Sequence, residues 1–144
     1  MPVKVLAFSK LKQALSERNM EFTDFLVKKF GVAYVVAVTR EKCSGCEQQK
    51  PLFEKLSDKM KNKHNNRVDF VRVHARFNPD NKEETMQCLD MVQTVAFPTY
   101  LVYVRNQQGK SRETYRAVEP PMNEIERNVK TAVELANWFE SKRE

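Results

Sequence analysis

An uninterrupted apolar run at residues 32–38, followed within a few positions by two cysteines, constrains the fold of this chain more than any other feature. The run reads Val-Ala-Tyr-Val-Val-Ala-Val and lacks the alternation of a half-exposed strand. Such runs are typical of a central strand that helices cover on both faces. Segment 46–63 after the cysteines has apolar residues at helical spacing. The pattern therefore predicts a buried strand that leads directly into a cysteine-bearing helix start.

The rest of the chain alternates between helical and extended patterns. Helices are expected at 9–18, 24–30, 83–95 and 122–139, and further strands at 19–22, 67–75, 99–104 and 113–118. A turn at 106–109 joins the last two strands into an antiparallel hairpin. Strand-helix-strand units followed by a hairpin imply one mixed α/β sheet with helices on both faces.

Length and charge bound the organisation of the chain. With 144 residues, 41% of them hydrophobic, the chain suffices for one compact domain, and we expect a monomer. The net charge is +6, but basic residues are interleaved with glutamates, so we expect a solvated surface and no nucleic-acid partner. No run approaches a secretory signal or the ~20 apolar residues of a membrane span. We expect a cytoplasmic protein, or a lumenal or extracellular domain if the sequence is a trimmed fragment.

The motif Cys43-Ser44-Gly45-Cys46 carries the candidate chemistry. Cys43 falls at a predicted helix N-terminus, where free backbone N–H groups and the helix dipole favour an anion. Lys42 adds a cation beside it, and both effects lower a thiol pKa. The two-residue spacing lets Cys46 reach the sulfur of Cys43. We therefore expect Cys43 to be an exposed attacking thiolate and Cys46 a covered resolving thiol.

Two other interpretations of the cysteine pair stay open. The pair could pack as inert thiols, or it could supply half of a zinc site. Zinc needs two further ligands, and His64, His74 and Cys88 stand alone in the sequence. We therefore favour redox chemistry, predict no metal, and interpret Cys88 as a small core residue.

Two further motifs make the chain resemble the thioredoxin superfamily. Pro51, five residues after Cys46, falls where that family carries a helix-kinking proline. Phe97-Pro98-Thr99 looks like the family's segment in which a cis-proline faces the disulfide just before a strand. The hairpin and the final helix follow in the family's order.

The resemblance covers residues 19–139 and implies a thioredoxin fold. We therefore divide the chain into an N-terminal helical extension at 1–18 and a thioredoxin-like domain at 19–144. The resemblance also implies a thiol-disulfide oxidoreductase without a bound cofactor. Its substrates would be disulfide-containing proteins, and its electrons would come from a separate reductase or small thiol. The implied catalytic residues are Cys43 and Cys46, and the implied substrate contacts are Lys42, Ser44, Gly45, Phe97 and Pro98.

Several positions depart from the family's pattern. Lys42 replaces the aromatic residue before the first cysteine, and Ser44-Gly45 replaces Gly-Pro. Ala37 stands where the family has a buried aspartate, and Arg72 where it has the lysine that pairs with this aspartate. These departures leave two alternatives: a disulfide-forming or isomerising domain of an oxidising compartment, or a client-binding module whose cysteines are idle.

Overall fold

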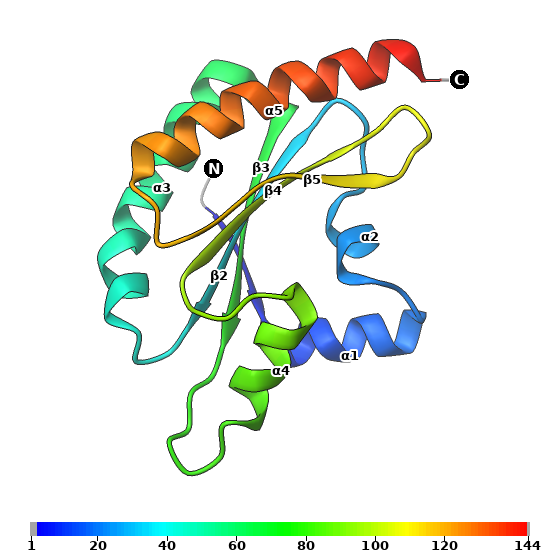
Figure 1. The fold of residues 1–144 in the computed structure, drawn as a ribbon. Helices are drawn as coiled ribbons and strands as arrows, with labels where there is room; N and C mark the ends of the chain where they lie inside the picture. The colour runs from blue at the N-terminus through cyan, green and yellow to red at the C-terminus, as the bar shows by residue number, and fades with distance from the viewer. Residues whose placement is uncertain (1–2, 144) are drawn as a thin grey trace.

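The computed structural model of the chain describes residues 3–143 as a five-stranded sheet between two layers of helices (Figure 1). The strands are β1 (Lys4–Ala7), β2 (Ala33–Arg40), β3 (Val68–Ala75), β4 (Thr99–Arg105) and β5 (Ser111–Val118). The helices are α1 (Phe8–Arg18), α2 (Phe22–Leu26), α3 (Ser44–His64), α4 (Glu83–Val92) and α5 (Met122–Lys142), with a short 3-10 turn, η1 (Asn65–Arg67), after α3.

The sheet has the order β1-β3-β2-β4-β5. β1 and β2 both run parallel to β3, whereas β4 is antiparallel to β2 and β5 is antiparallel to β4. Helices α3 and α5 cover one face, and α1, α2 and α4 cover the other (Figure 1). The prediction of a mixed α/β sheet flanked by helices is confirmed.

The N-terminal part differs from the sequence-based prediction. Residues 19–22 form no strand, because Asn19 ends α1 in the left-handed conformation at φ 48° and Phe22 begins α2. The first strand is instead β1, an edge strand whose side chains are mostly exposed. Exposure on an edge leaves no long apolar run, so the hydrophobic pattern does not predict β1. The boundary between a 1–18 extension and a 19–144 domain remains a prediction.

Two predicted helices are shorter in the structure. The helix expected at 24–30 spans Phe22–Leu26, and the helix expected at 83–95 ends at Val92. Gln93 adopts a left-handed conformation at φ 57° that caps α4. Val95, the last residue of the predicted helix, lies outside α4 and is 87% exposed.

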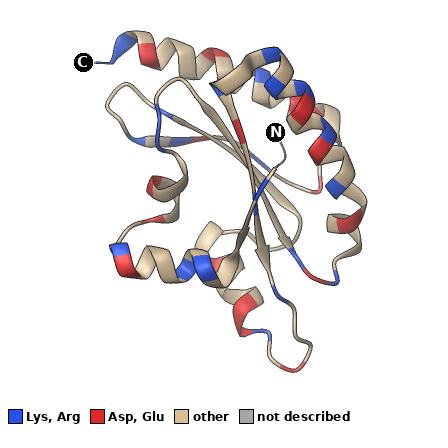
Figure 2. Ribbon diagram, turned by 180° about the vertical axis from the view of Figure 1, so that it is seen from behind, with Lys and Arg blue, Asp and Glu red and all other residues tan. Residues whose placement is uncertain are grey.

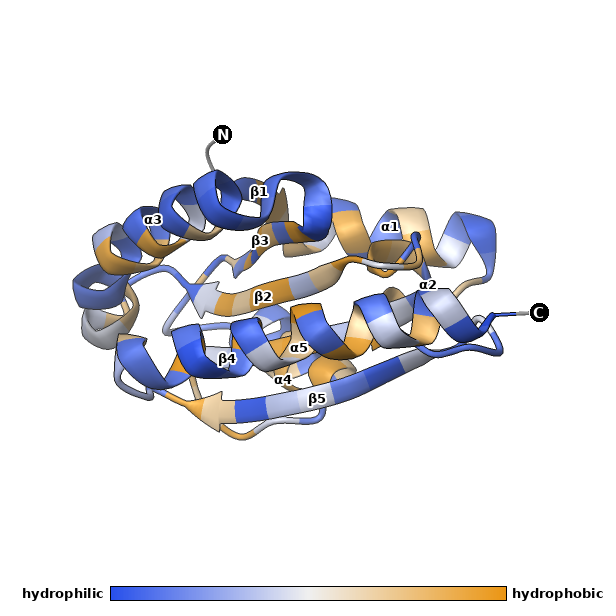
Figure 3. Ribbon diagram, turned by 90° about the horizontal axis from the view of Figure 1, so that it is seen from above, coloured by the Kyte–Doolittle hydropathy of each residue, from blue (hydrophilic) through white to orange (hydrophobic). Residues whose placement is uncertain are grey.

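Each face of the sheet has its own core. Alternate residues of β2 enter opposite cores, with Val35 packed under α3 and α5 and Val36 packed under α1, α2 and α4. Both residues are fully buried, which explains the continuous apolar run of the sequence. Figure 3 shows hydrophobic residues along β2 and hydrophilic ones along most of β5. Because β2 is the central strand, it places the start of α3 at the carboxyl ends of the parallel strands, where α/β sheets commonly position functional groups.

Residues 4–18 belong to the same core as the rest of the chain, and this can be tested by mutation. Phe8 is 2% exposed in the α1 side core, whereas Val5 on β1 is 57% exposed. Phe8→Ala is expected to lower the free energy of unfolding by about 3–5 kcal/mol. Val5→Ala is expected to change it by no more than about 0.5 kcal/mol. Urea unfolding followed by circular dichroism measures both, and equal effects would contradict the packing described.

Candidate functional site

Cys43 and Cys46 form a disulfide at the N-terminus of α3, with their Cα atoms 5.2 Å apart. Cys43 is the N-cap of this helix, and its Sγ accepts a hydrogen bond from the backbone N–H of Cys46 at 3.2 Å. Free N–H groups and the helix dipole stabilise negative charge at this position. The sulfur of Cys43 therefore occupies the place where a carboxylate or hydroxyl oxygen commonly caps a helix.

Both cysteines are covered in this oxidised form. Cys43 is 7% exposed and Cys46 is 5% exposed, so the exposed Cys43 that we expected is wrong for the disulfide state. The segments that contain Pro98 and Glu119 lie against Gly45 between the two cysteines. Coverage by segments distant in sequence explains why the motif alone did not reveal this burial.

The turn before Cys43 is held by Arg40. Its guanidinium donates hydrogen bonds to the carbonyl oxygens of Glu41 and Lys42, at 2.7 and 2.9 Å. The same group lies 4.2 Å from the ring centre of Phe77 and 5.9 Å from that of Phe97. These bonds fix a turn in which Lys42 has a left-handed backbone at φ 54°. Sequence reasoning did not identify Arg40, because its partners become neighbours only in the fold.

Pro98 approaches the motif from the segment before β4. The Phe97–Pro98 peptide bond is cis. The Cδ of Pro98 lies 3.3 Å from the position that a Cβ on Gly45 would take, so these two predicted contact residues lie together. Lys42 and Ser44 are exposed on the preceding turn and the start of α3. The structure thus brings Pro98 against the cysteine motif. Phe97 is connected to the motif indirectly, because Arg40 contacts both its ring and the turn before Cys43.

A buried cation lies on the face of the sheet that α3 covers. Arg72 is 6% exposed and stands directly opposite Ala37 in the register of β2 and β3. Next along β3, His74 shares a hydrogen bond of 2.8 Å with the hydroxyl of Thr39. Burial lowers the pKa of His74, and the positive charge of Arg72 lowers it further. His74 is therefore held in its neutral form.

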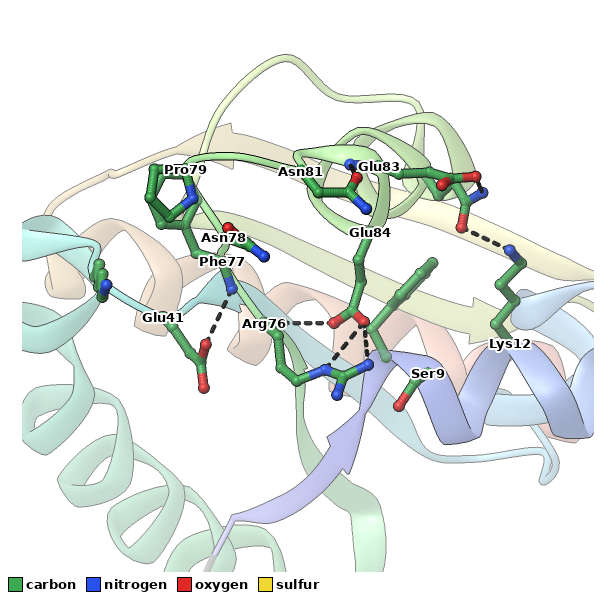
Figure 4. Close-up of a pocket in the computed structure, with 13 residues that line it drawn as sticks. Ser9, Lys12, Glu41, Arg76, Phe77, Asn78, Pro79, Asn81, Glu83 and Glu84 are labelled. Atoms are coloured by element: carbon green, nitrogen blue, oxygen red, sulfur yellow. Dashed lines mark hydrogen bonds and ion pairs between the residues drawn. The ribbon is translucent and has the colours of Figure 1, made fainter.

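A polar groove of about 740 Å³ opens beside Lys42. Its walls are the start of α1, the turn before α3, the loop after β3 and the start of α4 (Figure 4). Arg76 and Glu84 pair across it at 2.9 Å, and the backbone N–H of Phe77 donates to Glu41 at 3.0 Å. The loop of residues 76–82 is thus tied to the turn that carries Cys43.

Charged residues of both signs are spread over the surface. Figure 2 shows them interspersed along α3. Lys59 of α3 pairs with Glu126 of α5 at 2.9 Å, and Arg67 pairs with Glu140 at 2.7 Å. No helix of the described part of the chain is both long and apolar enough to cross a membrane. Within residues 3–143, no group of three or more His, Cys, Asp or Glu residues is arranged to hold a metal ion.

Comparisons with known proteins identify the fold. No family model matches the chain, and no curated protein matches its sequence. Among solved structures, thioredoxin NaTrxh from Nicotiana alata is 22% identical, with a TM-score of 0.57 over 92% of this chain and 95% of that chain. Malassezia sympodialis thioredoxin is 19% identical, with a TM-score of 0.57 over 92% and 95%. Thioredoxin f from spinach chloroplast is 13% identical, with a TM-score of 0.60 over 91% and 93%. The structural superpositions establish a shared fold, and at identities this low they do not establish a shared activity.

The third cysteine offers an internal reference for the reactivity of the other two. Cys88 is a free thiol with no exposed surface, and burial, with a contribution from Glu84, raises its pKa to about 12. In the folded, reduced protein at about pH 8, we expect iodoacetamide to modify Cys43 and to leave Cys88 intact, because only thiolates react. Mass spectrometry of timed samples measures this, and denaturant should expose all three thiols. Equal labelling rates for Cys43 and Cys88 in the folded protein would contradict the assignment.

Proposed function

We propose, taking the thioredoxin fold of this chain as the premise, that the protein is a thiol-disulfide oxidoreductase acting through Cys43 and Cys46. The observation that carries the proposal is the position of the Cys43 Sγ at the N-cap of α3, where it accepts the Cys46 N–H. A thiolate formed there gains a hydrogen bond and the favourable end of the helix dipole. This stabilisation supports our assignment of Cys43 as the attacking residue.

The reaction proceeds in two exchange steps. The Cys43 thiolate attacks one sulfur of a substrate disulfide, so that a mixed disulfide forms and the other substrate sulfur leaves as a thiolate. Cys46 gives up its proton to water and attacks the Cys43 Sγ, which forms the Cys43–Cys46 bond and releases the second substrate thiolate. Two electrons pass to the substrate, whose thiolates take up protons. A separate reductase or a small dithiol returns the pair to its reduced form, and no bound cofactor is needed.

Substrate contacts are proposed for the residues around the disulfide. Lys42 and Ser44 are exposed beside it, and Gly45 lies against Pro98. The backbone of Phe97 would pair with an extended segment of the substrate, as the resemblance to the family implies. We propose that disulfide-containing proteins are the substrates, that the protein acts as a monomer, and that it works as a cytoplasmic reductant.

One observation favours a second function. Arg72 is a buried cation that faces Ala37, so the sheet position beside it provides no carboxylate. A cation on the sheet face that α3 covers would favour the thiolate form of the dithiol over the disulfide, which would make the pair a stronger oxidant. A disulfide-forming or isomerising role in an oxidising compartment would use the same two cysteines.

Serine substitutions test the assigned roles of the two cysteines. Cys43→Ser is expected to abolish reduction of a protein disulfide by the chain in the presence of dithiothreitol. Reduced Cys46→Ser, mixed with the substrate after dithiothreitol is removed, is expected to stop at the mixed disulfide, because the resolving thiol is missing. Non-reducing gels and intact-mass measurements detect that species. Cys88→Ala is the matched control, and it should keep the activity because Cys88 takes no part in the exchange.

Two results would overturn the proposal. Full activity of Cys43→Ser would show that another group performs the exchange. Wild-type protein that binds clients but reduces no disulfide would favour a client-binding module with idle cysteines.

A further inference from the structure

The loop between β5 and α5 is anchored to the candidate site at two points. The backbone N–H of Glu119 donates to the carbonyl oxygen of Pro98 at 2.9 Å. The side-chain amide of Gln49, on α3, donates to the carbonyl oxygen of Pro120 at 2.7 Å. Glu119 makes the first of these bonds and the residue after it makes the second. The backbone of Glu119 is therefore fixed relative to Pro98 and to the helix that carries the cysteines.

The side chain of Glu119 extends over the cysteine motif. A Cβ placed on Gly45 would overlap the Oε1 atom of Glu119 and would lie 3.0 Å from its Cδ. The carboxylate therefore fills the space that the missing side chain of Gly45 leaves. Gly45 directly precedes Cys46 and follows Cys43 by two residues, so the negative charge of Glu119 lies against the segment between the two cysteines.

The backbone of Glu119 does not explain why a glutamate occupies this position. Its φ of 46° lies in the left-handed region, which favours glycine or asparagine and disfavours glutamate. A residue held in such a conformation beside a functional site is a reason to look for a role of its side chain. The carboxylate is the group that a glycine at this position would lack.

The carboxylate is also available to a ligand. Glu119 is an exposed residue, and within residues 3–143 its carboxylate has neither an ion-pair nor a hydrogen-bond partner. Arg40, a cation at the turn before Cys43, is occupied by two backbone carbonyl groups. Burial raises the pKa of Tyr100 to about 12, with Arg72 opposing the rise and Glu119 adding to it.

We propose that Glu119 determines substrate specificity by selecting disulfides that carry a lysine or arginine next to the attacked sulfur. A substrate half-cystine that is bonded to Cys43 must lie beside Gly45, and its neighbouring residue then meets the Glu119 carboxylate. A basic neighbour gains an ion pair there, and an acidic neighbour meets a like charge. This inference rests on the proposed function, because it names the substrate class of that same site.

Matched disulfide peptides test the inference. Each peptide has one internal disulfide and differs only in the residue beside the cysteine, which is Lys, Gln or Glu. Fully reduced protein is mixed with each peptide in a single turnover, and the reaction is stopped with acid. Each rate is divided by the rate of the same peptide with dithiothreitol, which removes the intrinsic reactivity of that disulfide. The compared proteins are the wild type, Glu119→Gln and Glu134→Gln, an equal charge change at an exposed residue of α5.

The expected result is a normalised Lys-to-Glu rate ratio of about fivefold for the wild type, which is the size of surface ion-pair effects. The ratio should fall to near one in Glu119→Gln, stay at the wild-type value in Glu134→Gln, and shrink with added salt. A wild-type ratio of one, or an unchanged ratio in Glu119→Gln, would overturn the role of Glu119 while the exchange activity stands. Failure of the wild type to reduce any peptide would instead reject the proposed function itself.

A glycine variant separates the charge from the backbone. Glu119→Gly removes the same carboxylate and suits the left-handed conformation, so the variant should fold and melt about 3 °C above the wild type. It should also lose the Lys-to-Glu preference. A glycine variant that keeps the preference would show that the loop backbone, and not the carboxylate, selects the substrate.

Discussion

The hydrogen bond from the Cys46 N–H to the Cys43 Sγ is the interaction on which the chemistry of this molecule depends. It exists because Cys43 ends the connection from β2 and caps the first turn of α3. The position of β2 is fixed by burial on both faces of the sheet, and α3 is held to the neighbouring strands by Phe53, which packs against Phe70 of β3 and Tyr100 of β4. The cores on both sides of the sheet therefore determine where a single sulfur atom lies.

Charges of both signs lie beside the cysteine motif and on the sheet face that α3 covers. The helix terminus and the exposed Lys42 favour a thiolate, and the buried Arg72 is a further cation on the α3 side of the sheet. The Glu119 carboxylate lies over the motif and acts in the opposite sense. A like charge near a thiolate raises the free-energy cost of forming it, so the proposed exchange would be slowed by this glutamate and favoured by the helix terminus and the cations. In our account the same charge is used to choose which disulfides approach.

The features that the sequence predicted correctly are those that depend on neighbouring residues. The buried strand at 32–38 and the cysteine motif at the start of a helix both follow from neighbouring residues, and the structure contains them as β2 and α3. The edge strand β1 was missed because its exposed side chains give no hydrophobic signal. The ends of α2 and α4 were misplaced because single left-handed or irregular residues, such as Gln93, stop a helix without a proline or glycine.

The parts of the site that the sequence did not reveal are contacts between distant segments. Glu119 and Gly45 meet only because the loop after β5 folds back onto α3. Arg40 meets Phe77 through the loop after β3. In each case the neighbouring sequence does not distinguish the residue, and only the tertiary arrangement gives it a place in the site.

The redox equilibrium of Cys43 and Cys46 tests the central claim most directly. The protein is equilibrated in graded glutathione or dithiothreitol buffers, its free thiols are alkylated, and the reduced fraction is read by mass. We predict a single two-electron transition of this pair, at a potential between about −270 mV, as in thioredoxin, and about −120 mV, as in strong oxidants. A value near the first supports the reductant, and a value near the second supports the disulfide-forming alternative. If no Cys43–Cys46 disulfide forms at any buffer potential, the account as a whole is contradicted.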